Sequence, residues 1–116
     1  MSLLSNDLCA RLIAFRDERN WKQFHTPRNL AASVAIEACE LLESFQWARD
    51  DELDAVVSRN RVSIEDEIAD VLILLNYLCI DLEVDVEAAV SRKIARNEVK
   101  YPREKAKGRA DKYDAL

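Results

Sequence analysis

The chain has 116 residues, a formal net charge of −5, one glycine and two prolines. Glycine makes up about 7% and proline about 5% of ordinary chains, so this sequence lacks the residues that many-stranded sheets and glycine-rich phosphate loops require. We therefore expect one all-α domain. The acidic balance argues against nucleic acid and anionic membranes as partners, because both are densely negative.

The cysteines and the N-terminus indicate a cytoplasmic protein. The three cysteines are far apart, show no CxxC spacing and lie in apolar segments, which is typical of buried side chains in a reducing compartment. The first residues lack the basic run and apolar core of a secretory leader. The longest apolar stretch, Val71–Leu75, is far too short to span a bilayer.

Apolar spacing predicts two helices in the first half of the chain. Leucines at steps of four, followed by Phe15, form one stripe of a helix over about 5–20. A loop follows at 21–26. Thr26 then offers a cap and Pro27 suits a first helical turn, so the second helix is expected to run to about Trp47.

Two more helices are predicted after a connection at 48–62, which could hold a short helix of its own. Ser63 is expected to cap the third helix, over about 64–82. Asp85 is expected to cap the fourth, which should end near Tyr101 because a proline follows.

The third predicted helix indicates self-association. Val71–Leu75 is apolar on every face, and a monomer of this length rarely buries one helix completely. We therefore expect a four-helix-bundle-like fold in a homo-oligomer. The expected domain division is a helical domain over 1–102 and a polar C-terminal tail over 103–116.

Two pairs of acids carry the chemistry that the sequence suggests. Glu37 and Glu40 lie three apart on the second predicted helix, and Glu67 and Asp70 lie three apart on the third. Each pair stands at the edge of an apolar stripe, where a carboxylate without a partner is costly. About four such pairs are expected by chance in so acidic a chain, so either pair alone could be a solvated face.

If the two pairs face each other, four carboxylates share one site. Protonation or a bound cation relieves their repulsion. The oxygen-only donors, with no histidine or cysteine beside them, favour Mg²⁺, Mn²⁺ or Ca²⁺ over Zn²⁺. Mg²⁺ commonly binds through a few carboxylates together with substrate phosphates, so the pattern suits hydrolysis of a phosphate ester or anhydride.

Aromatic residues near these acids suggest a nucleobase site. Trp47 follows Glu40 by seven residues and so returns to nearly the same helix face. It could stack on a base or be part of a core or interface, and Trp21 and Phe24 in the first loop have the same two interpretations. His25, the single histidine, could bind a ligand or hydrogen-bond at the helix entry.

Charge is distributed unevenly along the chain. Residues 1–91 carry a net charge of −10 and residues 92–116 a net charge of +5. Lys93, Asn97 and Lys100 share one face of the fourth predicted helix, with Tyr101 adjacent. This face could be solvated, or it could meet the outer phosphates of a substrate.

Four sequence runs together resemble the MazG-like all-α nucleoside triphosphate pyrophosphohydrolases, most closely the dCTP pyrophosphatase branch. The resemblance covers about residues 5–113. The runs are WKQFHTPRNL at 21–30, EACELLESFQW at 37–47, EDEIADVLILL at 65–75 and KIARNEVKYP at 93–102.

This resemblance implies a Mg²⁺-dependent hydrolase, with Mn²⁺ as a possible substitute, that converts dCTP or modified dCTP to the monophosphate and pyrophosphate and so cleanses the nucleotide pool. It also implies a homodimer or homotetramer with sites shared between chains. By the same resemblance Glu37, Glu40, Glu67 and Asp70 bind the metal and carry catalysis. The residues implied to contact the nucleotide are Trp21, Lys22, Gln23, Phe24, His25, Trp47, Asp70, Lys93, Asn97 and Tyr101.

The residues leave some alternatives open. Either Glu37 or Glu40 could orient the attacking water or accept its proton. The bundle could instead be a noncatalytic oligomer that acts as an interaction scaffold. A related pyrophosphohydrolase acting on dUTP or phosphoribosyl-ATP is the alternative among enzymes.

Overall fold

The computed structural model describes residues 3–116, and all regular structure in that range is helical, which confirms the all-α prediction. Short 3₁₀ turns lie at Lys22–Phe24, Asp50–Glu52 and Tyr113–Ala115. The six α-helices of the described range are α1 (Asn6–Glu18), α2 (Pro27–Glu43), α3 (Leu53–Arg59), α4 (Arg61–Asp81), α5 (Val86–Lys100) and α6 (Arg103–Ala106).

The helix starts follow local capping chemistry. The Thr26 Oγ1 atom accepts a hydrogen bond from the Asn29 amide at 3.1 Å, and the Asp85 Oδ1 atom accepts one from the Ala88 amide at 3.1 Å. These bonds satisfy amides that have no partner inside the helix, and they confirm both predicted caps. α5 also ends at Lys100, immediately before Tyr101, as predicted.

The prediction that Ser63 caps the third helix is wrong. α4 already begins at Arg61, so Ser63 lies within its first turn. Asn60 ends α3 and directly precedes α4, and its carbonyl accepts a hydrogen bond from the Ile64 amide at 2.9 Å. Because one residue joins the two helices, no loop is left for a serine to close.

The second helix is shorter than predicted. α2 ends at Glu43, and the chain continues through tight turns to Trp47. The Ser44 amide donates to the Leu41 carbonyl, and the Phe45 amide donates to the Leu42 carbonyl. Such three-residue spacing is the tighter winding that often ends a helix, so the predicted boundary lies beyond the α-helix proper.

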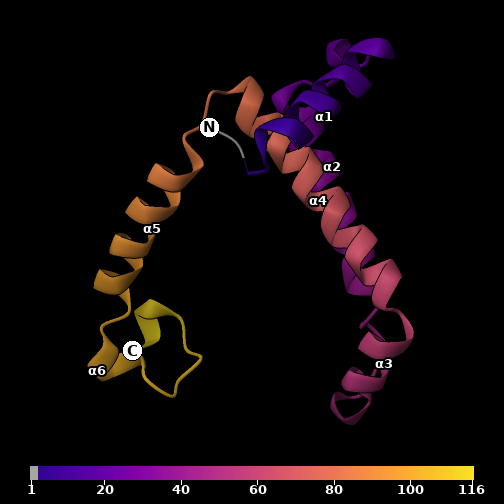
Figure 1. Ribbon diagram of the computed structural model, residues 1–116. Coiled ribbons are helices and arrows are strands. Elements are labelled where there is room, and N and C mark those ends of the chain that lie inside the picture. Colours follow the sequence, from indigo (N-terminus) through magenta and orange to yellow (C-terminus); the bar gives the residue numbers. More distant parts are fainter. Residues whose placement is uncertain (1–2) are drawn as a thin grey trace.

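The centre of the molecule is the pair α2 and α4, which run side by side in opposite directions (Figure 1). α3 lies at one end of this pair and α1 at the other, while α5 and α6 stand away from it. The buried apolar side chains of the described range are Cys9, Leu30, Val56, Ile64 and Tyr77. The expectation of buried cysteines holds for Cys9 only, since Cys39 is exposed and Cys79 half-buried.

The single chain is open rather than compact. Its accessible surface is 8938 Å² at a mass of 13.3 kDa, whereas a compact protein of that mass exposes about 6,500 Å². Its radius of gyration is 17.8 Å, against about 13 Å for a compact chain of this length. α5 does not close a four-helix arrangement with α1, α2 and α4 of its own chain.

The apolar run of α4 also remains partly uncovered. None of the residues in Val71–Leu75 is buried, and Leu72 is 36% exposed. Within residues 3–116, no helix is both long and apolar enough to cross a bilayer.

Candidate metal centre

The acidic residues predicted as metal ligands come together where α2 and α4 pack. Carboxylate oxygens of Glu37, Glu67 and Asp70 all lie within 4.8 Å of one another. Glu37 comes from α2, and the other two come from successive turns of α4. The antiparallel packing of two long helices therefore brings together acids that are thirty residues apart in sequence.

Two oxygens of this cluster are buried without a hydrogen-bond donor. Among the described residues, the Oε2 atoms of Glu37 and of Glu67 are inaccessible to solvent and have no partner. A buried polar atom normally has a hydrogen-bond partner, so each orphan needs an explanation. A bound cation coordinated by these two oxygens would explain why they lack a hydrogen-bond donor.

The cluster favours the protonated forms of its acids. The pKa of Glu37 is raised to about 7, first by the hydrogen bond that its protonated form makes with Glu40, then by desolvation and by the charges of Glu40, Asp70 and Glu67. The pKa of Glu67 is raised first by desolvation and then by its acidic neighbours. These shifts arise because burial and neighbouring negative charges both disfavour a further carboxylate charge.

Glu40 lies beside the triad rather than in it. Its side chain is exposed, and it contributes to the raised pKa of both Glu37 and Glu67. This position leaves Glu40 available to complete a ligand set or to interact with a water molecule at its edge.

The donor set fits a hard divalent cation. All of the atoms are carboxylate oxygens, which Mg²⁺ and Mn²⁺ prefer, and no histidine or cysteine joins the cluster in the described range. The orphaned oxygens of Glu37 and Glu67, with Asp70 beside them, are the atoms that would hold the ion.

The loop at 21–26 presents aromatic side chains next to α1. The Trp21 ring packs edge-on against Phe15 with centroids 5.6 Å apart, and Phe24 is 60% exposed. Lys22 and Gln23 are exposed between them. His25 is half-buried against Tyr77, with ring centroids 5.2 Å apart, and its Nδ1 atom is buried without a partner in the described range.

The other predicted substrate residues are not gathered at the acids within this chain. Trp47 is 87% exposed beyond the end of α2. Lys93 and Asn97 are exposed on α5, which stands away from the α2 and α4 pair (Figure 1). Tyr101 packs edge-on against Tyr113 of the C-terminal segment, with centroids 6.1 Å apart.

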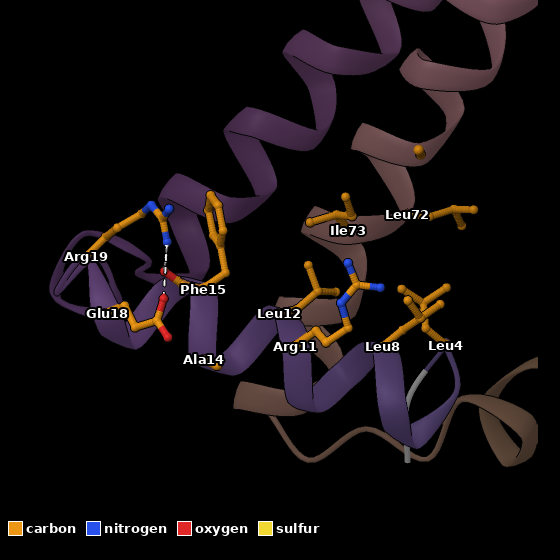
Figure 2. Close-up of a pocket in the computed structure, with 11 residues that line it drawn as sticks. Leu4, Leu8, Arg11, Leu12, Ala14, Phe15, Glu18, Arg19, Leu72 and Ile73 are labelled. Atoms are coloured by element: carbon orange, nitrogen blue, oxygen red, sulfur yellow. Dashed lines mark hydrogen bonds and ion pairs between the residues drawn. The ribbon is translucent and has the colours of Figure 1, made fainter.

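Sequence reasoning missed an apolar groove between α1 and α4. The groove has a volume of about 610 Å³. Figure 2 shows Leu8 and Leu12 of α1 beside the segment of α4 that carries Leu72 and Ile73. The stripe on α1 was visible in the sequence, but its partner helix was not. The groove is lined by Leu4, Leu8, Arg11, Leu12, Ala14, Phe15, Glu18, Arg19, Ala69, Leu72 and Ile73.

Comparisons with known proteins agree on one kind of relative. The sequence model of the MazG-like family matches residues 32–116 of the chain. The chain is 40% identical over 104 residues to "dCTP pyrophosphatase 1" of Bos taurus and of Mus musculus, over 88% of this chain and 62% and 61% of theirs. It therefore spans about three fifths of the length of these relatives. The crystal structure of a pyrophosphatase from Archaeoglobus fulgidus matches with a TM-score of 0.79 and 50% identity, over 83% of this chain and 90% of that chain.

Proposed function

The chain belongs to the MazG-like family, and on that premise we propose that it is a Mg²⁺-dependent nucleoside triphosphate pyrophosphatase. It cleaves between the α and β phosphates and releases a monophosphate and pyrophosphate. dCTP or modified dCTP is the proposed substrate, because the curated relatives at 40% identity are named for dCTP. The proposed role is cleansing of the cytoplasmic nucleotide pool.

The observation that carries this proposal is the cluster of Glu37, Glu67 and Asp70, with two buried carboxylate oxygens that no protein group satisfies. The chain has one glycine and therefore no glycine-rich loop whose backbone amides could cradle phosphates. Metal ions held by carboxylates would allow so acidic a surface to attract a triphosphate.

Each acidic residue has a proposed part in the reaction. Mg²⁺ or Mn²⁺, when bound, neutralises phosphate charge and lowers the pKa of a coordinated water. Glu67, Asp70 and Glu37 would hold the ion. Glu37 or Glu40 orients the attacking water or accepts its proton. The water adds directly to phosphorus, so no covalent intermediate with the protein forms.

The nucleotide is proposed to lie between the aromatic loop and a basic helix. Trp21, Phe24 and His25 face the base and sugar, and the exposed rings of Trp21 and Phe24 offer stacking surfaces. Trp47 lies beyond the opposite end of α2, so its proposed contact with the base is made from a second copy. Lys93, Asn97 and Tyr101 meet the outer phosphates.

Because α5 stands away from the acids of its own chain, we infer that these groups act at the site of a second copy. The chain exposes about 2,500 Å² more than a compact protein of its mass. That excess suits an obligate homodimer or homotetramer, whose interfaces bury more than about 2,000 Å².

Pyrophosphate release from a nucleotide panel tests the proposal. The panel contains dCTP, 5-methyl-dCTP, dUTP and phosphoribosyl-ATP, each with Mg²⁺, Mn²⁺ or a chelator. We expect release from dCTP or its modified form with metal only. Preference for dUTP or phosphoribosyl-ATP would reassign the substrate. No release from any nucleotide would favour the noncatalytic interaction scaffold, with which the exposed apolar surface also agrees.

A matched pair of variants on α4 tests the ligand set. Glu67→Gln removes a carboxylate from the cluster, whereas Glu65→Gln changes an exposed carboxylate on the same helix that pairs with Arg61 at 3.0 Å. We expect Glu67→Gln to abolish metal-dependent release and Glu65→Gln to retain it. Equal activity in the two variants would mean that the cluster is not the metal centre.

A further inference from the structure

Outside the acidic cluster, one ion pair in the described part of the chain is buried. The Arg16 side chain of α1 is 3% exposed and meets the Asp81 carboxylate at the end of α4, which is 15% exposed. The Nη1 atom donates to Oδ2 at 2.8 Å and the Nη2 atom donates to Oδ1 at 2.9 Å. In every other ion pair of residues 3–116, both side chains are at least 43% exposed.

Such a pair holds an orientation more than it adds stability. A two-pronged arginine–carboxylate contact fixes the relative direction of both side chains. Its attraction is largely offset by the loss of hydration, so apolar side chains of similar volume often serve stability as well. A buried pair of this kind therefore raises the question of what it orients.

The pair is connected to the aromatic loop through Tyr77. The Arg16 guanidinium carbon lies 4.6 Å from the centre of the Tyr77 ring, and the Tyr77 hydroxyl donates to the Leu12 carbonyl at 2.7 Å. The same ring packs against His25 at the end of the loop, with centroids 5.2 Å apart. Asp81, Arg16, Tyr77 and His25 thus form one continuous row of contacts.

The other end of the loop is attached to Arg16 itself. The Arg16 carbonyl accepts hydrogen bonds from the Arg19 amide at 3.3 Å and from the Trp21 amide at 3.0 Å. The second of these bonds spans the turn at Asn20, whose φ of 53° lies in the left-handed region. One residue therefore fixes where the loop begins through its backbone, and contributes to fixing where it ends through its side chain.

We propose that Arg16, Tyr77 and Asp81 are positioning residues that hold the Trp21–His25 loop in place for nucleotide binding. The identity of the ligand rests on the proposed function, but the anchoring of the loop does not. Exposed aromatic side chains on a free loop must be ordered each time a ligand binds, which weakens affinity. An anchor that orders them beforehand lowers KM and leaves the chemical step to the acids.

Arg16→Lys tests the anchor, with Arg61→Lys as its matched control. Lysine keeps the charge at position 16 but loses the two-pronged contact and the flat group that lies over the Tyr77 ring. Arg61 makes an exposed pair with Glu65, so Arg61→Lys makes the same chemical change at an ion pair that touches no loop. We expect Arg16→Lys to raise KM for dCTP about tenfold and to change kcat by less than about threefold, because the ordering cost of two side chains falls on binding. Arg61→Lys should change neither constant.

A second readout is independent of catalysis. In a Trp47→Phe background the one remaining tryptophan is Trp21, so its fluorescence reports the loop alone. We expect acrylamide to quench Trp21 fluorescence more strongly in Arg16→Lys than in the background protein. In Arg61→Lys, quenching should equal that of the background protein. A protein that releases no pyrophosphate would still show this difference if the anchor is real, so failure of the proposed function is distinguishable.

A paired replacement separates the anchor from simple stability. Arg16→Met together with Asp81→Leu replaces the ion pair by apolar side chains and is expected to keep the chain folded. With the fold retained by circular dichroism, KM and Trp21 quenching should still rise as in Arg16→Lys. Wild-type KM and quenching in this double variant, or a fall in kcat at constant KM, would overturn the proposal.

Discussion

Replacing Ile94 by alanine is expected to weaken self-association of the chain. Val86, Val90 and Ile94 follow one another at steps of four on α5 and form an apolar stripe. Val90 is 51% and Ile94 53% exposed. The stripe has no partner within the described chain, so a second copy is the surface proposed to cover it.

The size of the effect follows from the exposure of Ile94. Full burial of an isoleucine side chain is worth about 1.5–3 kcal/mol. Since 53% of the residue remains exposed in the single chain, about half of that value, roughly 0.8–1.6 kcal/mol, is available on association. In a twofold dimer the stripe is buried twice, so Ile94→Ala should cost about 1.6–3.2 kcal/mol and raise the dissociation constant about 15- to 200-fold.

Analytical ultracentrifugation over a dilution series measures this constant. Val99→Ala is the control, because Val99 is 79% exposed on the opposite face of the same helix. We expect the wild type and Val99→Ala to sediment as dimers or tetramers at micromolar concentration, with Ile94→Ala dissociating at higher concentration. A monomeric wild type, or an Ile94→Ala constant within twofold of the wild type, would refute the reasoning.

Three further predictions concern pH and the composition of the site. The pKa of Glu37 is raised from 4.5 to about 7, so its contribution to metal-free stability is present below pH 4.5 and lost as pH rises through 7. With chelator present, the melting temperature of the wild type should therefore fall relative to that of Glu37→Gln as the pH rises from 4.5 to 7. Melting temperatures that change in parallel with pH would contradict the raised pKa. Burial first, and then the Arg16 charge, lower the pKa of His25 below 6.5, so its contribution is present above pH 6.5 and lost as pH falls through its lowered pKa. The melting temperature of the wild type should therefore fall relative to that of His25→Gln as the pH is lowered. A relative fall as the pH is raised would contradict the lowered pKa. Finally, Glu67→Gln chains and Lys93→Ala chains, each inactive alone, should recover roughly a quarter of wild-type activity when they are refolded together. Half of the random dimers are mixed, and each mixed dimer has one of its two sites intact. No recovery would place α5 at the site of its own chain.

The sequence contains most of the local structure because helix capping is a local property. Thr26 and Asp85 each cap a helix three residues from the amide they satisfy, so the chemistry can be read without tertiary information. Ser63 offers the same side-chain chemistry but lies inside α4, because Asn60 joins α3 and α4 without a loop. A capping residue is predictive only where the chain actually turns.

The acidic cluster was predictable for a different reason. Glu37 and Glu67 interrupt apolar stripes, and a carboxylate at such a position needs a partner in any fold that buries the stripe. Which acids meet was not predictable, because that depends on the antiparallel register of α2 and α4. The structure brings Glu37, Glu67 and Asp70 within 4.8 Å of one another and leaves Glu40 at the edge.

Long-range contacts formed by single residues were not predictable from spacing. Arg16 and Asp81 are 65 positions apart, and each alone resembles an ordinary surface charge at the end of an amphipathic helix. The position of α5 was also hidden, because periodicity shows that a stripe must be covered but not which chain covers it. Contacts between helices, and between copies, hold the information that the sequence pattern lacks.

The account depends most directly on where the triphosphate is cut and on what that cut requires. Phosphorus NMR of dCTP incubated with the wild type and Mg²⁺ should show dCMP and pyrophosphate, with no signal from orthophosphate. The same sample with Glu67→Gln, or with chelator, should show unchanged dCTP. Release of orthophosphate and dCDP, or cleavage that persists in chelator, would contradict the central claim that this acidic cluster supports metal-dependent cleavage between the α and β phosphates.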